Sequence, residues 1–332
     1  MLEHGGRLLA ASRHYAIPPD GWLDLSTGIA PWPYPAPAIP ASAWQRLPED
    51  DDGLRETACA YYAAAHVTHI LPLAGSQAAI LALPRLRVPG TVAVLAPTYG
   101  EYAPAWRAAG HRVAECMADE LLRQAADVIM LANPNNPDGL RFACDELLAA
   151  AQGLAKRGGW LIVDEAFADV DAADSLAAVA GTAQAENVVV LRSLGKFFGL
   201  AGARVGFCIA APALLARLQE MLGPWPIAHP SRCIAKVGLG DTAWQVAQNG
   251  KLRTARARLA QLLTAHGLPP AADTALFAYV PCAAAAALHE FLARRGILVR
   301  CFTAPAALRF GLPATENDWM RLARALAGWG SK

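Results

Sequence analysis

The chain has few charged residues and almost no net charge. Charged side chains make up 17% of its 332 residues, and the formal net charge is +1. This balance gives no reason to expect nucleic acid or an anionic membrane surface as a partner. Hydrophobic residues make up 55% of the chain. That content argues against intrinsic disorder and predicts one or two domains around a large core.

Long apolar runs and cysteine pairs are also missing. No apolar run approaches the roughly 20 residues that span a bilayer, and the start, MLEHGGR, has no apolar signal core. The seven cysteines are odd in number, and none forms a Cys-x-x-Cys pair. We therefore expect buried thiols in a reducing compartment and a cytoplasmic protein without a membrane partner.

Prolines and β-branched residues indicate how the chain is organised. Residues 1–45 contain four prolines between positions 31 and 37, so we predict an extended arm rather than a long helix. Short β-branched runs then alternate with helical segments, which predicts a mainly parallel sheet buried on both faces. The runs are Thr91–Leu95, Asp127–Leu131, Trp160–Val163, Asn187–Leu191 and Ala203–Ile209.

The loop before the last of these runs is too short for a helical crossover, which allows one antiparallel strand. Beyond residue 226, a long helical stretch precedes one short strand, a helix and two further short strands, which suggests a smaller α/β domain. We predict an α/β fold with an N-terminal arm at 1–45, a large domain at 46–225 and a small C-terminal domain at 226–332.

One lysine lies in a turn of small residues. The segment SLGKFFGLAGARVGF follows the predicted strand Asn187–Leu191 and places Ser193 three residues before Lys196 and Arg204 eight residues after it. Loops at the C-terminal ends of parallel strands bind ligands in open α/β sheets. Most lysines are ordinary surface residues, but the glycines, hydroxyl and arginine around this one favour a functional role.

Three further motifs lie upstream of the lysine. Asp164 ends a predicted strand, where an aspartate is also a common helix N-cap. Asn133 opens the sequence Asn-Pro-Asn-Asn-Pro-Asp-Gly, which is also typical of a proline-rich turn. Gly75, Ser76 and Gln77 follow a short apolar run and open a helix. Glycine and free backbone N–H groups at a helix start form a cup for phosphate.

Taken in chain order, these segments resemble the cofactor site of pyridoxal 5'-phosphate (PLP) enzymes with the aspartate aminotransferase fold. The resemblance implies that Lys196 forms a Schiff base with the cofactor aldehyde and that Asp164 keeps the pyridine nitrogen protonated. It also implies that Asn133 hydrogen-bonds the phenolic oxygen. The remaining implied cofactor residues are Gly75, Ser76, Gln77, Ser193 and Arg204 for the phosphate and Tyr99 for the ring face.

Two arginines near the C-terminus are candidates for substrate anions. Arg309 resembles the family's arginine for the substrate carboxylate, and Arg300 could meet a second anionic group. An ordinary surface position is the alternative for both. Chain segments rich in small residues can place N–H groups and hydroxyls against a phosphate. This adds four candidates for the substrate phosphate, which are His4, Gly5, Gly6 and Ser26.

Within this fold, the chain resembles histidinol-phosphate aminotransferases and, more closely, threonine-phosphate decarboxylases of cobalamin biosynthesis. Aminotransferases tend to have tyrosines where this chain has Leu47 and Phe167. The two differences therefore argue against a site adapted to transamination, but they do not argue against cofactor binding. The closer resemblance rests on His4-Gly5-Gly6, Leu23–Ile29, Leu47–Gly53 and Asp164–Phe167.

The resemblance implies decarboxylation of L-threonine O-3-phosphate to (R)-1-aminopropan-2-yl phosphate by a homodimer. Two alternatives stay open. The first is an aminotransferase that acts on histidinol phosphate or a similar amino-phosphate. The second is a non-catalytic PLP-fold protein that docks a partner of cobalamin assembly. The residues alone do not decide between decarboxylation and transamination.

Overall fold

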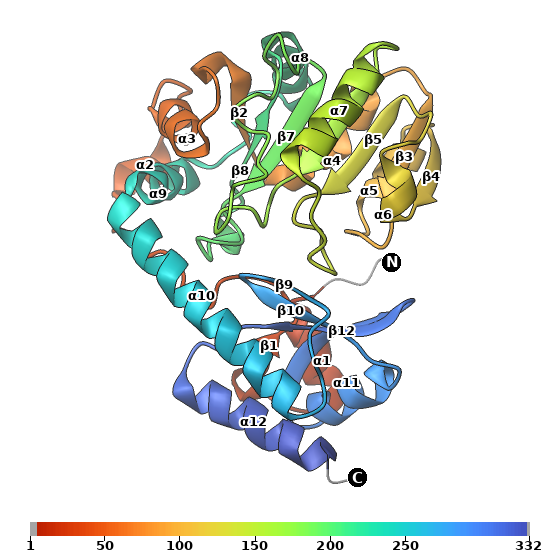
Figure 1. Cartoon of the computed structure of the whole chain (residues 1–332). Helices are drawn as coiled ribbons and strands as arrows, with labels where there is room; N and C mark the ends of the chain where they lie inside the picture. The colour runs from red at the N-terminus through yellow and green to blue at the C-terminus, as the bar shows by residue number, and fades with distance from the viewer. Residues whose placement is uncertain (1–4, 331–332) are drawn as a thin grey trace. The chain divides into compact units, whose positions relative to one another are not determined.

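The computed structural model describes residues 5–330, which form two compact units (Figure 1). The large unit comprises Tyr34–Asn136 and Leu140–Trp244. The small unit comprises the described residues up to Pro33, the short segment Pro137–Gly139 and the residues from Gln245 onward. No helix among the described residues is long and apolar enough to cross a membrane.

A seven-stranded sheet forms the centre of the large unit, in the order β2-β8-β7-β6-β5-β3-β4. Its strands pair in parallel except β8, which is antiparallel to both of its neighbours. The predicted mainly parallel sheet with one antiparallel strand is confirmed. The strands are β2 (Ile70–Leu73), β3 (Thr91–Leu95), β4 (Arg112–Cys116), β5 (Val128–Ala132), β6 (Trp160–Asp164), β7 (Val188–Ser193) and β8 (Gly206–Ile209).

Helices bury the apolar faces of this sheet. Ile80, Trp106 and Leu218, from three different helices, pack with β-strand side chains in one hydrophobic cluster. Helix α7 crosses the sheet in Figure 1 and buries Leu147 and Leu154. The helices of the large unit are α2 (Ala41–Gln45), α3 (Leu54–Tyr62), α4 (Ser76–Ala82), α5 (Tyr102–Ala108), α6 (Ala118–Leu121), α7 (Cys144–Ala155), α8 (Pro212–Leu222) and α9 (His229–Gly240).

The small unit contains a five-stranded sheet in the order β1-β11-β12-β10-β9. β1 pairs with β11 in parallel and the other pairs are antiparallel. The strands are β1 (Leu23–Leu25), β9 (Ala272–Thr274), β10 (Phe277–Pro281), β11 (Ile297–Thr303) and β12 (Ala306–Gly311). The helices are α1 (Leu8–Tyr15), α10 (Thr242–Ala265, in this unit from Gln245), α11 (Ala285–Ala293) and α12 (Glu316–Gly330).

Two parts of the chain differ from the sequence-based expectations. The predicted extended arm contains α1, because the proline-rich region begins only after this helix and Leu8–Tyr15 has no proline. The boundaries of the compact units also differ from the predicted boundaries at residues 45 and 225, because the large unit begins at Tyr34 and ends at Trp244. Helix α9 packs against α3 within the large unit, and β1 joins the sheet of the small unit.

Candidate active site

A cavity in the large unit collects most of the predicted cofactor residues. It lies where β5, β6 and β7 end, at Ala132, Asp164 and Ser193. All predicted cofactor residues except Asn133 line it. The lining residues are Gly75, Ser76, Gln77, Tyr99, Tyr102, Ala132, Asn136, Asp164, Ala166, Phe167, Ser193, Lys196 and Arg204.

One wall of the cavity is formed by Gly75, the start of helix α4 and the side chain of Arg204. Gly75 has φ +75°, and a Cβ there would lie 2.9 Å from an Nη atom of Arg204. A side chain at position 75 would therefore displace the guanidinium. No side chain caps the start of α4, so the first N–H groups of the helix, at Ser76 and Gln77, are placed to receive an anion.

Lys196 is held in place by its buried neighbours. Phe197 and Phe198, which follow it directly, are almost fully buried, and the Phe198 ring stacks on Trp244 with centroids 5.6 Å apart. Lys196 itself is half-buried, and its Nζ atom lies 5.2 Å from the centroid of the Phe167 ring. The aromatic neighbours thus fix the loop and leave the amine at the cavity.

Asp164 presents a buried carboxylate to the same cavity. Asp164 is only 4% exposed to solvent. Oδ2 accepts a hydrogen bond from the Tyr102 hydroxyl at 2.9 Å, and Oδ1 accepts one from the Ala166 N–H at 3.0 Å. Burial raises the pKa of Asp164, while these two hydrogen bonds and the positive charges of Lys196 and Arg192 oppose that rise.

Tyr99 lies at the cavity as predicted. Its hydroxyl donates a hydrogen bond to Gln77 Oε1 at 3.2 Å, and its ring meets the Tyr102 ring edge-on at 5.4 Å. Burial is the main cause that raises the pKa of Tyr99 to about 12. The phenol is therefore neutral near pH 7 and offers an aromatic surface to a ligand.

Asn133 does not line the cavity. Its side-chain amide pairs with the backbone of Phe142, donating to the carbonyl and accepting from the N–H, both at 3.0 Å. The expectation from sequence is that this amide faces a ligand; instead it closes the loop and lies outside the cavity lining. Asn136, from the same motif, lines the cavity instead.

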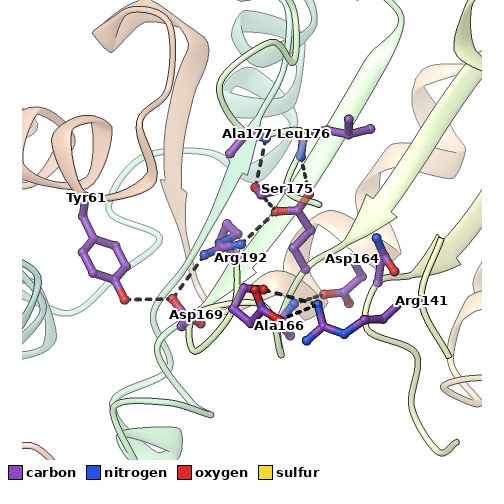
Figure 2. Close-up of polar contacts among 12 residues, drawn as sticks. Tyr61, Arg141, Asp164, Ala166, Asp169, Ser175, Leu176, Ala177 and Arg192 are labelled. Atoms are coloured by element: carbon purple, nitrogen blue, oxygen red, sulfur yellow. Dashed lines mark hydrogen bonds and ion pairs between the residues drawn. The ribbon is translucent and has the colours of Figure 1, made fainter. Parts of the chain in front are cut away.

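A buried charged cluster lies beside Asp164, and sequence reasoning missed it (Figure 2). Arg192 contacts Glu165 Oε2 at 2.8 Å and Asp169 Oδ1 at 3.3 Å, and all three side chains are almost completely buried. Glu165 also accepts hydrogen bonds from the Ser175 hydroxyl and the Leu176 N–H. The remaining member, Tyr61 of α3, donates to Asp169 at 3.1 Å.

In the small unit, the predicted substrate residues also come together. Gly5, Gly6, Ser26 and Arg300 line one hollow. Arg309 Nη2 donates to the Ser26 carbonyl at 2.7 Å, and the Gly6 N–H donates to Ser26 Oγ at 2.8 Å. His4 lies outside the described residues. The hollow has three further basic residues that sequence reasoning missed, namely Arg7, His14 and His289.

Arg300 and Arg309 face each other directly across β11 and β12. Like charges at directly opposite positions of an antiparallel pair destabilise a sheet. Burial, followed by the charge of Arg300, lowers the pKa of Arg309 to about 10. Two guanidinium groups held close together in this way would favour binding of an anion.

The cavity holds a lysine, a buried carboxylate and an arginine beside a helix start, at the C-terminal edge of a mainly parallel sheet. No group of His, Cys, Asp or Glu residues that could hold a metal ion occurs among residues 5–330. The fold and this site define the class of PLP-dependent aminotransferase-type enzymes. The chain belongs to the aminotransferase class I and II family, whose sequence model matches residues 48–326.

Relatives within this family are similar over almost the whole chain. A threonine-phosphate decarboxylase from Pseudomonas aeruginosa is 54% identical over 331 residues, which cover 99% of this chain and 98% of that protein. A threonine-phosphate decarboxylase from a Sinorhizobium species is 42% identical, with 98% of each chain covered.

A solved structure of the same fold is also similar. It is a histidinol-phosphate aminotransferase from Sinorhizobium meliloti in complex with pyridoxal 5'-phosphate. It superposes with a TM-score of 0.84 and 21% identity, covering 99% of this chain and 95% of that chain. At this identity, the likeness supports the fold alone.

Proposed function

We propose that the chain catalyses the PLP-dependent decarboxylation of L-threonine O-3-phosphate to (R)-1-aminopropan-2-yl phosphate, a step of cobalamin biosynthesis. The observation that carries this proposal is the 54% identity to a threonine-phosphate decarboxylase over 99% of the chain. The residues of the cavity supply the groups that the chemistry needs. Cobalamin biosynthesis is the pathway in which such decarboxylases act.

The cavity fits PLP by its chemistry. Gly75 leaves room for Arg204 beside the uncapped start of α4, so backbone N–H groups and a guanidinium can bind a phosphate together. A Cβ at Gly206 would lie 2.5 Å from the Ser76 nitrogen, which again shows that the chain backbones approach closely here. Ser193 lines the same cavity and offers a hydroxyl.

The other lining residues take the remaining roles. Lys196 would provide the amine for the cofactor aldehyde, and Asp164 would accept a hydrogen bond from the ring nitrogen. Tyr99 would cover a ring face. We assign the phenolic oxygen to Asn136 rather than Asn133, because the Asn133 amide is bound by the Phe142 backbone. When bound, PLP supplies the electron sink for the bond that breaks at the substrate Cα.

We assign the two substrate anions to the paired arginines of the small unit. Arg309 would bind the carboxylate bidentately, and Arg300 would bind the phosphate together with the hollow formed by Gly5, Gly6 and Ser26. His4 belongs to this assignment by its sequence position. Binding of both anions would offset the mutual repulsion of Arg300 and Arg309.

The proposal includes a homodimer in the cytoplasm. Several large apolar side chains of the large unit are exposed, among them Trp44 at 71%, Leu47 at 59% and Trp225 at 56%. Exposed apolar side chains of this size are typical of surfaces that other proteins cover. Light scattering of the purified protein would measure the assembly.

Incubation with threonine phosphate and PLP, followed by product identification, tests the proposed reaction. We expect CO₂ and an aminopropanyl phosphate. Formation of pyridoxamine phosphate without CO₂ would instead identify an aminotransferase. Phe167 argues against that outcome because the ring that it places in the cavity has no hydroxyl to donate to a ligand.

The substrate phosphate provides a second, sharper test. We expect Arg300→Ala to lower kcat/KM for threonine phosphate by about one to two orders of magnitude, since a charge-assisted hydrogen bond contributes roughly 1.5–3 kcal/mol. The variant should also discriminate less between threonine phosphate and threonine. Arg258→Ala, at an exposed ion pair with Glu316 in the same unit, is the control. An unchanged ratio of the two kcat/KM values would remove Arg300 from the phosphate site.

A further inference from the structure

Tyr102 is a buried tyrosine whose hydroxyl contacts Asp164. It is the first residue of α5 and is 1% exposed. Its hydroxyl donates to Asp164 Oδ2 at 2.9 Å, although 62 residues separate the two in the chain. Both side chains line the cavity. This contact therefore ties α5 to the end of β6 at the point where the carboxylate meets the site.

The two oxygens of Asp164 are held by different parts of the chain. Oδ1 accepts from the Ala166 N–H, only two residues further along the chain. The Tyr102 bond comes from another element and holds the second oxygen, so the two bonds together restrict rotation of the carboxylate. Tyr102 is in turn supported by the Tyr99 ring, whose hydroxyl is bound to Gln77. Tyr99, which we assign to the cofactor ring, is thus linked to the Asp164 carboxylate through Tyr102, three residues further along the chain.

We infer that Tyr102 is a positioning residue, whose hydroxyl holds the Asp164 carboxylate in one orientation and stabilises its negative charge for the ring nitrogen of the bound cofactor. This inference rests on the proposed PLP-dependent function. Asp164 forms no ion pair within the described part of the chain, and of its two neutral donors only the Tyr102 hydroxyl comes from a different element. The charged or titratable groups that act on Asp164 are Tyr102, Tyr99, Lys196 and Arg192.

The direction of the pH effect follows from these contacts. Burial raises the pKa of Asp164, and the Tyr102 hydrogen bond works against that rise because it stabilises the ionised form. Without the hydroxyl, the pKa of Asp164 rises further, and a smaller fraction is ionised at any given acidic pH. The acidic limb of the kcat/KM profile should therefore move to higher pH.

The test compares Tyr102→Phe with a matched control, Tyr34→Phe. Tyr34 is also buried and donates its hydroxyl to an aspartate of the large unit, Asp241, at 3.1 Å, but it does not line the cavity. We expect Tyr102→Phe to weaken PLP binding to the apoenzyme roughly tenfold and to shift the acidic limb up by about one pH unit. Tyr34→Phe should change neither quantity. Equal behaviour of the two variants would overturn the inference.

A double-mutant cycle shows whether Tyr102 acts through Asp164. If it does, adding Tyr102→Phe to Asp164→Asn should cost almost nothing in PLP affinity beyond Asp164→Asn alone. Additive losses would contradict the inference. If Tyr102→Phe is too unstable to purify, 3-fluorotyrosine at position 102 keeps the ring and strengthens the donor, so the acidic limb should move to lower pH. No shift, or a shift to higher pH, would again count against Tyr102.

These readouts separate the inference from the proposed function. PLP affinity of the apoenzyme is measured without any substrate. A wild-type protein that binds PLP but does not decarboxylate threonine phosphate would remove the proposed reaction and leave the Tyr102 test intact. A wild-type protein that decarboxylates, with a Tyr102→Phe variant of unchanged PLP affinity and pH profile, would remove only the inference.

Discussion

Two neighbouring carboxylates, Asp164 and Glu165, are buried in opposite ways. Both are almost inaccessible to solvent, and burial raises the pKa of both. Glu165 forms an ion pair with Arg192 and accepts two further hydrogen bonds. Asp164 accepts two hydrogen bonds from neutral donors and lines the cavity. Consecutive residues at a strand end face opposite sides of the sheet, so one carboxylate reaches the cavity and the other the charged cluster.

The difference indicates what each charge is for. A buried charge without a partner is costly, and proteins usually pair it or neutralise it. The charge of Glu165 is compensated within the protein by Arg192. That of Asp164 has no ion-pair partner among residues 5–330 and borders a cavity, which suits a carboxylate that pairs with a cationic ligand. Changes on the cavity side should therefore affect the reaction, and changes in the cluster should affect folding.

The largest effect on the cavity side is expected for Lys196→Ala. This variant should have no measurable turnover and should still fold, because its half-buried side chain contributes little to the core. PLP should bind it weakly and reversibly, since no amine remains to bond to the aldehyde. Activity assays and circular dichroism measure the two outcomes.

The lysine assignment can be contradicted directly. After borohydride reduction of the wild-type holoenzyme, a pyridoxyl label should be found on Lys196 by mass spectrometry of a digest. A label on another lysine would overturn the assignment. Lys236→Ala, at a lysine outside the cavity whose amine donates to the Asp52 carbonyl, provides a control for loss of a positive charge.

The lysine turn and the helix start at Gly75 line one cavity, and both could be found from sequence because their signals are local. The glycines and the Ser193 hydroxyl around Lys196, and Gly75 before a helix, need no knowledge of distant residues. Asn136 could not be distinguished from Asn133 in this way. Both belong to one polar motif, and the hydrogen bonds between Asn133 and Phe142 decide which amide reaches the cavity.

Contacts over long sequence distances explain the other omissions. The bond from Tyr102 to Asp164 and the pairing of Glu165 with Arg192 join separate segments, and no local pattern indicates them. Strand β4 was missed for a different reason. Its residues Arg112–Cys116 are mostly accessible at the edge of the sheet, so they lack the apolar run that indicated the buried strands.

Asp164→Asn should have the second-largest effect on turnover. The amide keeps the shape but cannot hold a ring nitrogen protonated, so we expect the barrier to rise by about 3–4 kcal/mol, as for other groups that act on developing charge in a dry site. Thermal stability should not fall, since an uncompensated buried charge is removed. Asp241→Asn, at an aspartate that also accepts from a buried tyrosine, is the control. A near-normal kcat would show that Asp164 only serves to cap the turn.

Glu165→Gln should have the smallest effect on turnover and a large one on stability. The amide cannot pair with the Arg192 charge, and removing one partner of a buried pair costs about 3–5 kcal/mol of unfolding free energy. Arg192 keeps its contact with Asp169, so we expect the lower end of that range and less than a tenfold change in kcat at a temperature where the variant is folded.

Glu49→Gln is the matched control for this last comparison. The ion pair of Glu49 with Arg46 is 2.7 Å long, similar to the 2.8 Å between Glu165 and Arg192. In contrast to that buried pair, the side chains of Glu49 and Arg46 are both mostly exposed. Exposed pairs contribute about 0–1 kcal/mol, so the control should unfold in urea almost like the wild type. A Glu165→Gln variant with normal unfolding free energy and greatly reduced kcat would contradict the interpretation that the charged cluster serves folding. The charged cluster would then act on the reaction, and the division between the two carboxylates would have to be abandoned.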